Sequence, residues 1–260
     1  MIPCRMNNIK NNVLLFISDD LRTQLGAYEG PDSPGGTVQK MYTPTTQSLL
    51  LKRGYIQITP CSPRRSSMLT SRRPHNTRVY NNAPNFRKVG GYFTILPQYF
   101  KQHCYTTVGL GKVFHPSSSP EEHETWSKPF FRGTKTFEDK KHSWNAIPDH
   151  LVKRQRPLND QQLADRTVKT LRTLEPQAVS GTQPFYIATG FYKPHLSLVF
   201  SESFLGHDRD VELPSNSYAP REMPTIGWSP YMELNSYADI KKLRVSSAMN
   251  ATFADKVALV

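Results

Sequence analysis

The sequence lacks any long run of apolar residues. A helix that crosses a bilayer needs about 20 of them in succession, and the mean hydropathy of this chain is −0.56. Its 260 residues, 37% of them hydrophobic, are enough for one sizeable buried core. The composition therefore predicts a globular protein with no membrane span.

Cysteine is scarce as well. Cys4, Cys61 and Cys104 are too few and too scattered to build a disulfide framework, so their number leaves the redox compartment open. The first ten residues carry no apolar core of the kind that marks a signal peptide. Neither feature assigns the protein to a compartment.

Acidic residues are outnumbered by basic ones. The chain has 33 lysines and arginines against 21 aspartates and glutamates, a net charge of +12, and such a surface attracts polyanions. The sequence has no zinc-ligand spacing, no aromatic RNA-binding signature and no basic heptad array. The positive charge is therefore the only feature that supports nucleic-acid binding, and we expect no nucleic-acid partner.

What the sequence does contain is an alternation of strand-like and helix-like segments, which is typical of layered α/β folds. Continuous apolar runs over residues 12–18 and 185–191 predict buried strands. The other expected elements are helices over 44–54, 94–103 and 160–174, with Thr43 and Asn159 as caps, and short strands over 54–58 and 105–108.

Two regions between these elements are expected to be long irregular loops. Residues 117–156 are rich in serine, proline, lysine and histidine, with Trp126 and Trp144 isolated among them, and residues 201–247 contain several prolines. Loops over strand ends often shape substrate pockets, although a solvated connection is an equally good interpretation.

The most informative segment is Cys-Ser-Pro-Arg-Arg at 61–65. Pro63 favours the first turn of a helix, so Cys61 falls near a helix N-terminus, where unpaired N–H groups and the helix dipole favour negative charge. Arg65 adds a permanent cation that can bind an oxyanion through two hydrogen bonds. This combination predicts a nucleophile beside an oxyanion-binding group, although an isolated match also arises by chance.

The segment resembles the signature of the sulfatase family, Cys-x-Pro-x-Arg followed by Leu-Thr-Gly, with Leu69 and Thr70 in place and Ser71 where the family usually has glycine. The resemblance implies that Cys61 is oxidised in the endoplasmic reticulum to formylglycine by a formylglycine-generating enzyme. The hydrated aldehyde would carry two hydroxyls, one to attack sulfur and the other to help expel sulfate. The serine affects the turn after Thr70 and not the nucleophile.

The first expected strand ends in Asp19 and Asp20, at the edge where ligands of α/β sheets gather. Two adjacent carboxylates repel each other unless a cation lies between them, and oxygen ligands suit a hard divalent ion. For the pair alone, a solvated turn is the simpler interpretation. The resemblance implies a calcium ion held by Asp19, Asp20 and the formylglycine derived from Cys61.

Two later segments complete the site that the resemblance implies. Gly111-Lys112-Val113-Phe114-His115 matches the family's Gly-Lys-x-x-His, in which the lysine binds sulfate oxygens and the histidine hydrogen-bonds the formylglycine or holds a proton. In Lys193-Pro194-His195 the histidine would contact the substrate sulfate or its leaving group. Without the cysteine motif, Lys112 would be interpreted as a surface lysine and His115 as a packing residue. The implied catalytic residues are Cys61, Arg65, Lys112 and His115, and the substrate-binding residues are Lys112 and His195.

Further segments narrow the resemblance to one subgroup of the family. They lie at 19–26, 72–80, 94–101, 111–116, 190–195 and 228–233, and include Leu-Pro-Gln-Tyr-Phe-Lys and Gly-Lys-Val-Phe-His-Pro. This subgroup implies a glycosaminoglycan substrate, a sulfated uronic acid of heparan or dermatan sulfate. It also implies a lysosomal or secretory location.

The resemblance implies an α/β fold, an alkaline-phosphatase-like three-layer sandwich with a central mixed, mostly parallel sheet. We expect residues 1–11 to form a tail and residues 12–260 to form part of the N-terminal catalytic domain, incomplete at its C-terminus. The family's later Asp-His-Gly or Asp-Asn-Gly segment, which adds metal ligands, and its downstream sulfate-binding lysine are not found in this sequence. We therefore expect weak calcium binding and little sulfatase activity from the 260-residue chain itself.

Two classes of function stay open, and a third is a weaker possibility. The first is a sulfuric ester hydrolase that acts through formylglycine. The second is a catalytically inactive sulfatase-like fragment that only binds sulfated polyanions through a basic pocket. The third, a phosphodiesterase or phosphatase of the same superfold, is disfavoured because those relatives use serine or threonine where this chain has Cys61.

Overall fold

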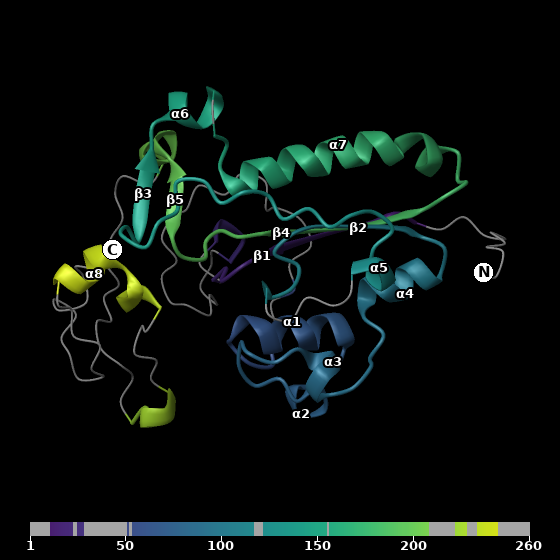
Figure 1. Ribbon diagram of the computed structural model, residues 1–260, viewed down its shortest axis with the longest axis horizontal. Helices are drawn as coiled ribbons and strands as arrows, with labels where there is room; N and C mark the ends of the chain where they lie inside the picture. The colour runs from purple at the N-terminus through teal and green to yellow at the C-terminus, as the bar shows by residue number, and fades with distance from the viewer. Residues whose placement is uncertain are drawn as a thin grey trace. The chain divides into compact units, whose positions relative to one another are not determined.

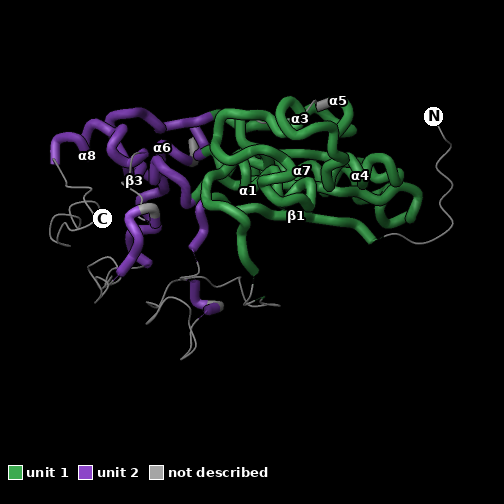
Figure 2. The backbone as a smooth tube through the Cα atoms, turned by 90° about the horizontal axis from the view of Figure 1, so that it is seen from below, with its two compact units in different colours: residues 1–19, 51–134, 159–193 green, residues 20–50, 135–158, 194–260 purple. Residues whose placement is uncertain are grey.

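The computed structural model describes residues 11–22, 25–28, 51, 54–116, 122–154, 156–207, 222–227 and 233–243. The chain forms two compact units, one of residues 1–19, 51–134 and 159–193 and the other of residues 20–50, 135–158 and 194–260 (Figure 2). Each unit is therefore assembled from segments that are far apart in the sequence. No helix within these described ranges is both long enough and apolar enough to span a membrane.

The first unit is built on a three-stranded parallel sheet in the order β1-β4-β2. Its strands are β1 (Val13–Ser18), β2 (Thr106–Gly111) and β4 (Phe185–Phe191). In the register, Ala188 of β4 lies between Leu15 of β1 and Gly109 of β2. Helices lie on both faces of the sheet (Figure 1), so this unit has the three layers of the expected α/β fold.

The helices of this unit are α1 (Cys61–Thr70), α2 (Pro74–Thr77), α3 (Phe86–Val89), α4 (Leu96–Gln102), α5 (Glu122–Thr125) and α7 (Asn159–Val179). α7 covers one face of the sheet, and the other five lie on the opposite side (Figure 1). Leu163 and Leu174 of α7 pack against Ile187, whereas Tyr186 and Ala188 face the other layer. β4 is therefore buried on both faces, because successive side chains of a strand point in opposite directions.

β1 is buried on one face. Val13, Leu15 and Ile17 pack against the cluster on the α1 side, whereas Leu14 is 40% and Phe16 is 56% exposed. The continuous apolar run predicted burial on both faces, and the difference arises because α7 packs over β4 and β2.

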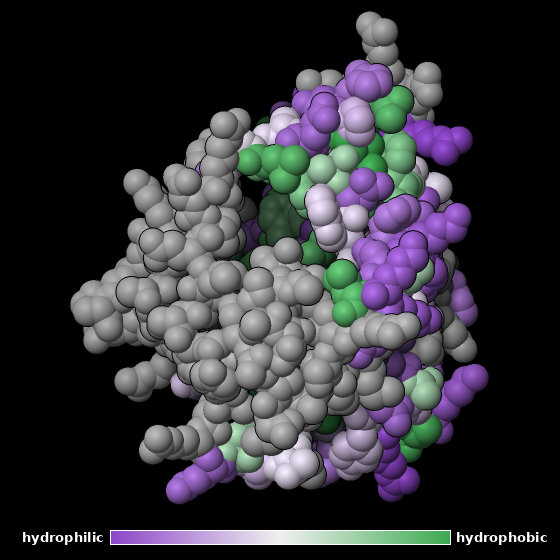
Figure 3. Space-filling model, turned by 90° about the vertical axis from the view of Figure 1, so that its left-hand side faces the viewer, coloured by the Kyte–Doolittle hydropathy of each residue, from purple (hydrophilic) through white to green (hydrophobic). Residues whose placement is uncertain are grey.

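Small groups of hydrophobic side chains also lie among hydrophilic ones on the face drawn in Figure 3, which is ordinary for a protein surface.

The second unit contains β3 (Trp144–Ile147), paired in parallel with β5 (Leu198–Ser201). Ile147 and Val199 pack together with Val152 in a small apolar cluster. Asp239 accepts hydrogen bonds from the N–H and the hydroxyl of Ser143 at 2.6 and 2.8 Å, which joins Asp239 to the residue just before β3. Its other elements are η1 (Gly26–Tyr28), α6 (Asp149–Arg154), η3 (Glu202–Gly206), η4 (Thr225–Gly227), η5 (Leu234–Ser236) and α8 (Ala238–Leu243).

Some sequence expectations are wrong. Residues 54–58 form no strand, and Tyr55 and Ile56 are 84% and 54% exposed because the segment joins no sheet in the described part of the chain. The region 117–156 is not simply a loop, since it contains β3 and α6. Trp126 within it is 3% exposed and packs on Phe114 and Phe130, so aromatic packing outweighs the polar composition around it.

For other segments, the observed elements differ from the expected ones in their bounds or in how regular they are. α7 continues to Val179, beyond the expected end at 174, with Pro176 in its last turn. The region 201–247, expected to be irregular, includes three short 3₁₀ helices and α8. The helix expected over 44–54 falls largely outside the described residues.

The turn after α1 provides a stability test. Ser71, which stands where the sulfatase signature has glycine, has φ 56° and ψ 30°, and the left-handed region costs a non-glycine residue about 1–2 kcal/mol. Part of this cost is offset because glycine has more freedom in the unfolded chain. We expect Ser71→Gly to raise the free energy of unfolding by about 0.5–1 kcal/mol, measured from urea midpoints.

The control is Ser67→Gly, which makes the same change inside α1, where the backbone is helical. It should lower the free energy of unfolding by roughly 1 kcal/mol. Equal effects of the two replacements would contradict the explanation.

Candidate active site

α1 presents three polar side chains on one face. Arg64 and Arg65 follow Cys61 by three and four residues, and residues at this spacing are neighbours on a helix surface. Cys61 is 8% exposed and Arg65 is 2% exposed. The expected helix is confirmed, because α1 begins at Cys61.

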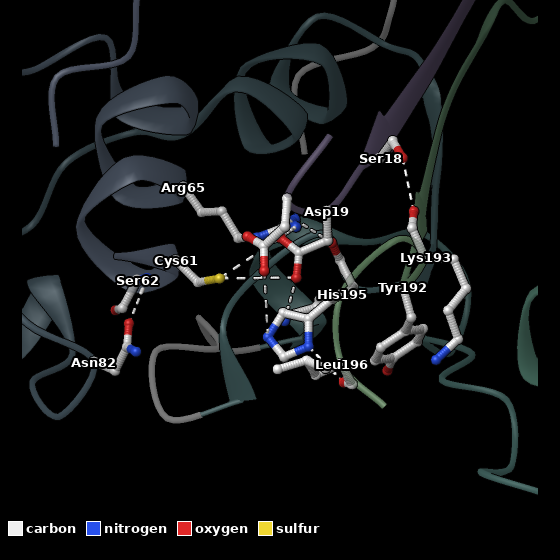
Figure 4. A network of polar contacts seen from close by, with 12 residues as sticks. Ser18, Asp19, Cys61, Ser62, Arg65, Asn82, Tyr192, Lys193, His195 and Leu196 are labelled. Atoms are coloured by element: carbon white, nitrogen blue, oxygen red, sulfur yellow. Dashed lines mark hydrogen bonds and ion pairs between the residues drawn. The ribbon is translucent and has the colours of Figure 1, made fainter. Parts of the chain in front are cut away.

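Asn82 completes the N-terminus of this helix. Pro60 precedes Cys61 and provides no side-chain cap. Instead, the N–H of Ser62 donates to Oδ1 of Asn82 at 2.9 Å (Figure 4), which satisfies one of the amides that a helix start leaves unpaired. The sequence analysis missed Asn82 because the two residues meet only in the folded chain.

Asp19 is the anion at the centre of the site, directly after β1, and it is fully buried. The thiol of Cys61 donates to its Oδ1 and Oδ2 at 3.6 and 3.7 Å (Figure 4). Nη2 of Arg64 lies 2.7 Å and Nη2 of Arg65 lies 2.5 Å from Oδ1. Nζ of Lys112 contacts Oδ2. Three cations thus surround one carboxylate beside the candidate nucleophile.

The charge of Asp19 results from two opposing effects. Burial alone raises the pKa of this carboxyl, because it penalises the ionised form. The charges and hydrogen bonds of Arg65 and Lys112 outweigh burial and lower the pKa from 3.8 to about 2. Asp19 is therefore ionised at neutral pH, and three positive charges against its one negative charge leave the group at +2.

Two glycines bring Lys112 to this position. Gly111 ends β2 with φ +71°, which glycine adopts without strain, and the N–H of Lys112 donates to the carbonyl of Gly190 at 2.7 Å. A Cβ at Gly190 would lie 2.2 Å from the backbone of Lys112. Nη1 of Arg65 donates to the carbonyls of Lys112 and Val113, so it fixes the same turn.

The turn after β4 is held in a similar way. Asp160, in the first turn of α7, accepts hydrogen bonds from the N–H groups of Tyr192 and Lys193 at 2.8 and 2.9 Å. The hydroxyl of Ser18 donates to the carbonyl of Lys193 at 2.7 Å (Figure 4). These bonds tie the ends of β1 and β4 together at the point where the chain continues toward His195.

His195 and Asp20 belong to the second unit. Nε2 of His195 lies 3.7 Å from Oδ2 of Asp20 and 3.7 Å from Oε1 of Glu233. Nδ1 of His195 lies 2.6 Å from the carbonyl of Leu196, and this nitrogen must donate because a carbonyl only accepts. Glu233 was missed as a site residue, although it ends one of the segments that carried the family resemblance.

The structure thus brings most of the predicted residues to the ends of β1, β2 and α1. Asp19, Cys61, Arg65 and Lys112 meet in the first unit, and Asp20 meets His195 in the second. His115 is half-buried three residues after Lys112, and its role stays a prediction. Arg64 was overlooked, although its spacing from Cys61 on the helix was a usable signal.

The donors at this site suit a hard divalent cation in their chemistry. Calcium takes about six to eight oxygen ligands, and the carboxylates of Asp19 and Asp20 are of that type. Both oxygens of Asp19 already contact cationic side chains. With the thiol of Cys61, these donors already fill the roughly four acceptor positions of a carboxylate, so a metal ion would replace at least one of them.

The ion pairs of Asp19 predict a pH dependence. Because the folded pKa of about 2 lies below 3.8, the ionised carboxyl stabilises the fold above pH 3.8, and this contribution is lost as the pH falls through about 2. The shift corresponds to a free energy on the order of 2 kcal/mol. In buffer with a chelator, Asp19→Asn should be less stable than wild type at neutral pH and should lose less stability between about pH 4 and 2.

Urea denaturation at several pH values measures this difference. Asp165→Asn, on the exposed side of α7, makes the same substitution without removing a buried ion pair. Its pH profile should follow wild type. Parallel profiles of wild type and Asp19→Asn would show that Asp19 does not titrate as described.

Comparison with known proteins identifies the family of this chain. The family model Sulfatase matches residues 11–240. The chain is 30% identical over 252 aligned residues to Iduronate 2-sulfatase from Homo sapiens and to its namesake from Mus musculus, covering 90% of this chain and 44% of each relative. It is 25% identical over 228 residues to a protein named Sulfatase from Formosa agariphila, covering 76% of this chain and 43% of the relative.

The chain therefore spans less than half the length of these relatives. The matched range contains both β1 and α1, and with them Asp19, Cys61 and Arg65. Because the family model covers most of the sequence and includes the elements that carry the site, this chain belongs to the sulfatase family.

Proposed function

We propose that this chain carries the nucleophile and anion-binding groups of a sulfuric ester hydrolase. The supporting observation is the buried carboxylate of Asp19, which joins Cys61 to Arg65 and Lys112. The two cations are fixed before any substrate arrives. Positive groups held in place in a site of low dielectric constant stabilise the negative charge that develops during ester cleavage.

Each side chain of the site has a separate proposed role in the reaction. Arg65 and Lys112 neutralise the sulfate oxygens, and Asp19 orients both cations toward Cys61. His115 and His195 supply groups that can hold or transfer a proton near neutral pH. A formylglycine made from Cys61 would supply a geminal diol, one hydroxyl of which would displace the alcohol from sulfur, and loss of the proton from the other would then expel sulfate as the aldehyde forms again.

We also propose calcium as the metal, held by Asp19, Asp20 and the modified Cys61. When bound, such an ion would supply a positive charge that favours an ionised oxygen on the nucleophile. Two carboxylates and one further oxygen supply only part of the shell that calcium prefers. We therefore expect weak calcium binding by the 260-residue chain.

The substrate class follows from the relatives named Iduronate 2-sulfatase. We propose a sulfated uronic acid at the end of heparan or dermatan sulfate, and the net charge of +12 supports attraction of such a polyanion. A formylglycine-generating enzyme would be a necessary partner. Such a protein would act in the lysosome or the secretory pathway, and residues 12–260 would form part of its catalytic domain.

A turnover measurement tests the reaction. The chain is co-expressed with a formylglycine-generating enzyme, and hydrolysis of an aryl sulfate is compared between wild type and Cys61→Ala. We expect slow hydrolysis that depends on Cys61, because the anion-binding groups are present and the three proposed calcium ligands supply only part of the shell. We expect Lys112→Ala to lower that rate by about a hundredfold, since it removes one charge from the sulfate oxygens.

Equal rates in wild type and Cys61→Ala would contradict catalysis. Retained binding of heparan sulfate would then favour the alternative, a sulfatase-like protein that only binds sulfated polyanions. For the substrate, an oligosaccharide ending in 2-sulfated iduronate should react faster than the aryl sulfate. The absence of that preference would contradict the proposed substrate class.

A further inference from the structure

Arg64 stands at the fourth position of the Cys-x-Pro-x-Arg motif, where the motif specifies no residue. Its Nη2 donates to Oδ1 of Asp19 at 2.7 Å and lies 3.7 Å from Sγ of Cys61. A guanidinium therefore lies against the candidate nucleophile without a role in the motif.

The three cations at Asp19 differ in how far solvent reaches them. The side chain of Arg65 is 2% exposed and that of Lys112 is 8% exposed, whereas that of Arg64 is 20% exposed. Arg65 is also held by the carbonyls of Lys112 and Val113. Arg64 is thus the cation that a solute entering from water reaches with the least rearrangement.

The charge balance indicates which kind of solute would bind. Arg65 and Lys112 together already exceed the single negative charge of Asp19, so Arg64 is not needed to neutralise it. Arg64 is therefore a third cation beside Cys61, and a cationic side chain that solvent reaches attracts an anion.

We propose that Arg64 binds the anionic group of the substrate directly, together with Arg65 and Lys112. The identity of that group as a sulfate ester rests on the proposed function. A guanidinium presents parallel N–H groups that match two oxygens of a sulfate. Because Arg64 also contacts Sγ of Cys61, an oxyanion bound to it lies next to the atom that carries the nucleophile.

The test measures binding without turnover, on the 260-residue chain with Cys61 left as a thiol. Inorganic sulfate is titrated by calorimetry at low ionic strength into wild type, Arg64→Ser, Arg64→Lys and Arg72→Ser. Arg72 is exposed just after α1, beyond the end of the helix opposite to Cys61. Its replacement matches the change in net charge without touching Asp19.

We expect Arg64→Ser to weaken sulfate binding by about tenfold or more, because a charged hydrogen-bond donor is lost. Arg64→Lys should weaken it less, and Arg72→Ser by less than about twofold. Equal affinities in Arg64→Ser and Arg72→Ser overturn the proposal, and so does a wild-type chain that binds no sulfate. Thermal unfolding checks each variant, and Arg64→Gln, which keeps most of the side-chain length, replaces Arg64→Ser if that variant does not fold.

Hydrolysis of the aryl sulfate separates this proposal from the proposed function. Hydrolysis that depends on Cys61, with unchanged sulfate affinity in Arg64→Ser, overturns the role of Arg64 alone. Weakened sulfate binding in Arg64→Ser, without hydrolysis that depends on Cys61, supports Arg64 as an anion contact and contradicts the enzyme.

Discussion

The ionised carboxylate of Asp19 organises the candidate active site. It is fully buried, and such a charge is costly unless cations and hydrogen bonds compensate it. Arg65 from α1 and Lys112 from the end of β2 provide that compensation, and Arg64 lies 2.7 Å from the same carboxylate. The same contacts fix the cations beside Cys61, so one electrostatic requirement of folding also arranges the groups needed to bind an oxyanion.

The fold brings these groups together because parallel strands end at one edge of the sheet. Asp19 follows β1 and Lys112 follows β2, which flank β4. Close approach of the backbones at Gly111 and Gly190 turns Lys112 toward that edge. α1 directs its N-terminus to the same place, where the helix dipole favours an anion.

The sequence predicted much of this arrangement, because motif residues and strand ends carry local signals. β4, α4 and the start of α1 are confirmed, and Asp19, Cys61, Arg65 and Lys112 meet as expected. Asn82 could not be predicted, because its bond to Ser62 joins segments without a shared pattern. The packing of Trp126 was missed for a similar reason, since its burial depends on aromatic partners rather than on the polar residues around it.

The central claim is that Cys61 is the precursor of the nucleophile, and mass spectrometry of its peptide tests this claim most directly. The chain is directed to the secretory pathway together with a formylglycine-generating enzyme, beside a known sulfatase as a positive control. The account predicts that the Cys61 peptide changes by the mass difference between a thiol and an aldehyde, and that the product reacts with a hydrazide probe. A Cys61 peptide that remains a thiol while the control is converted would contradict it.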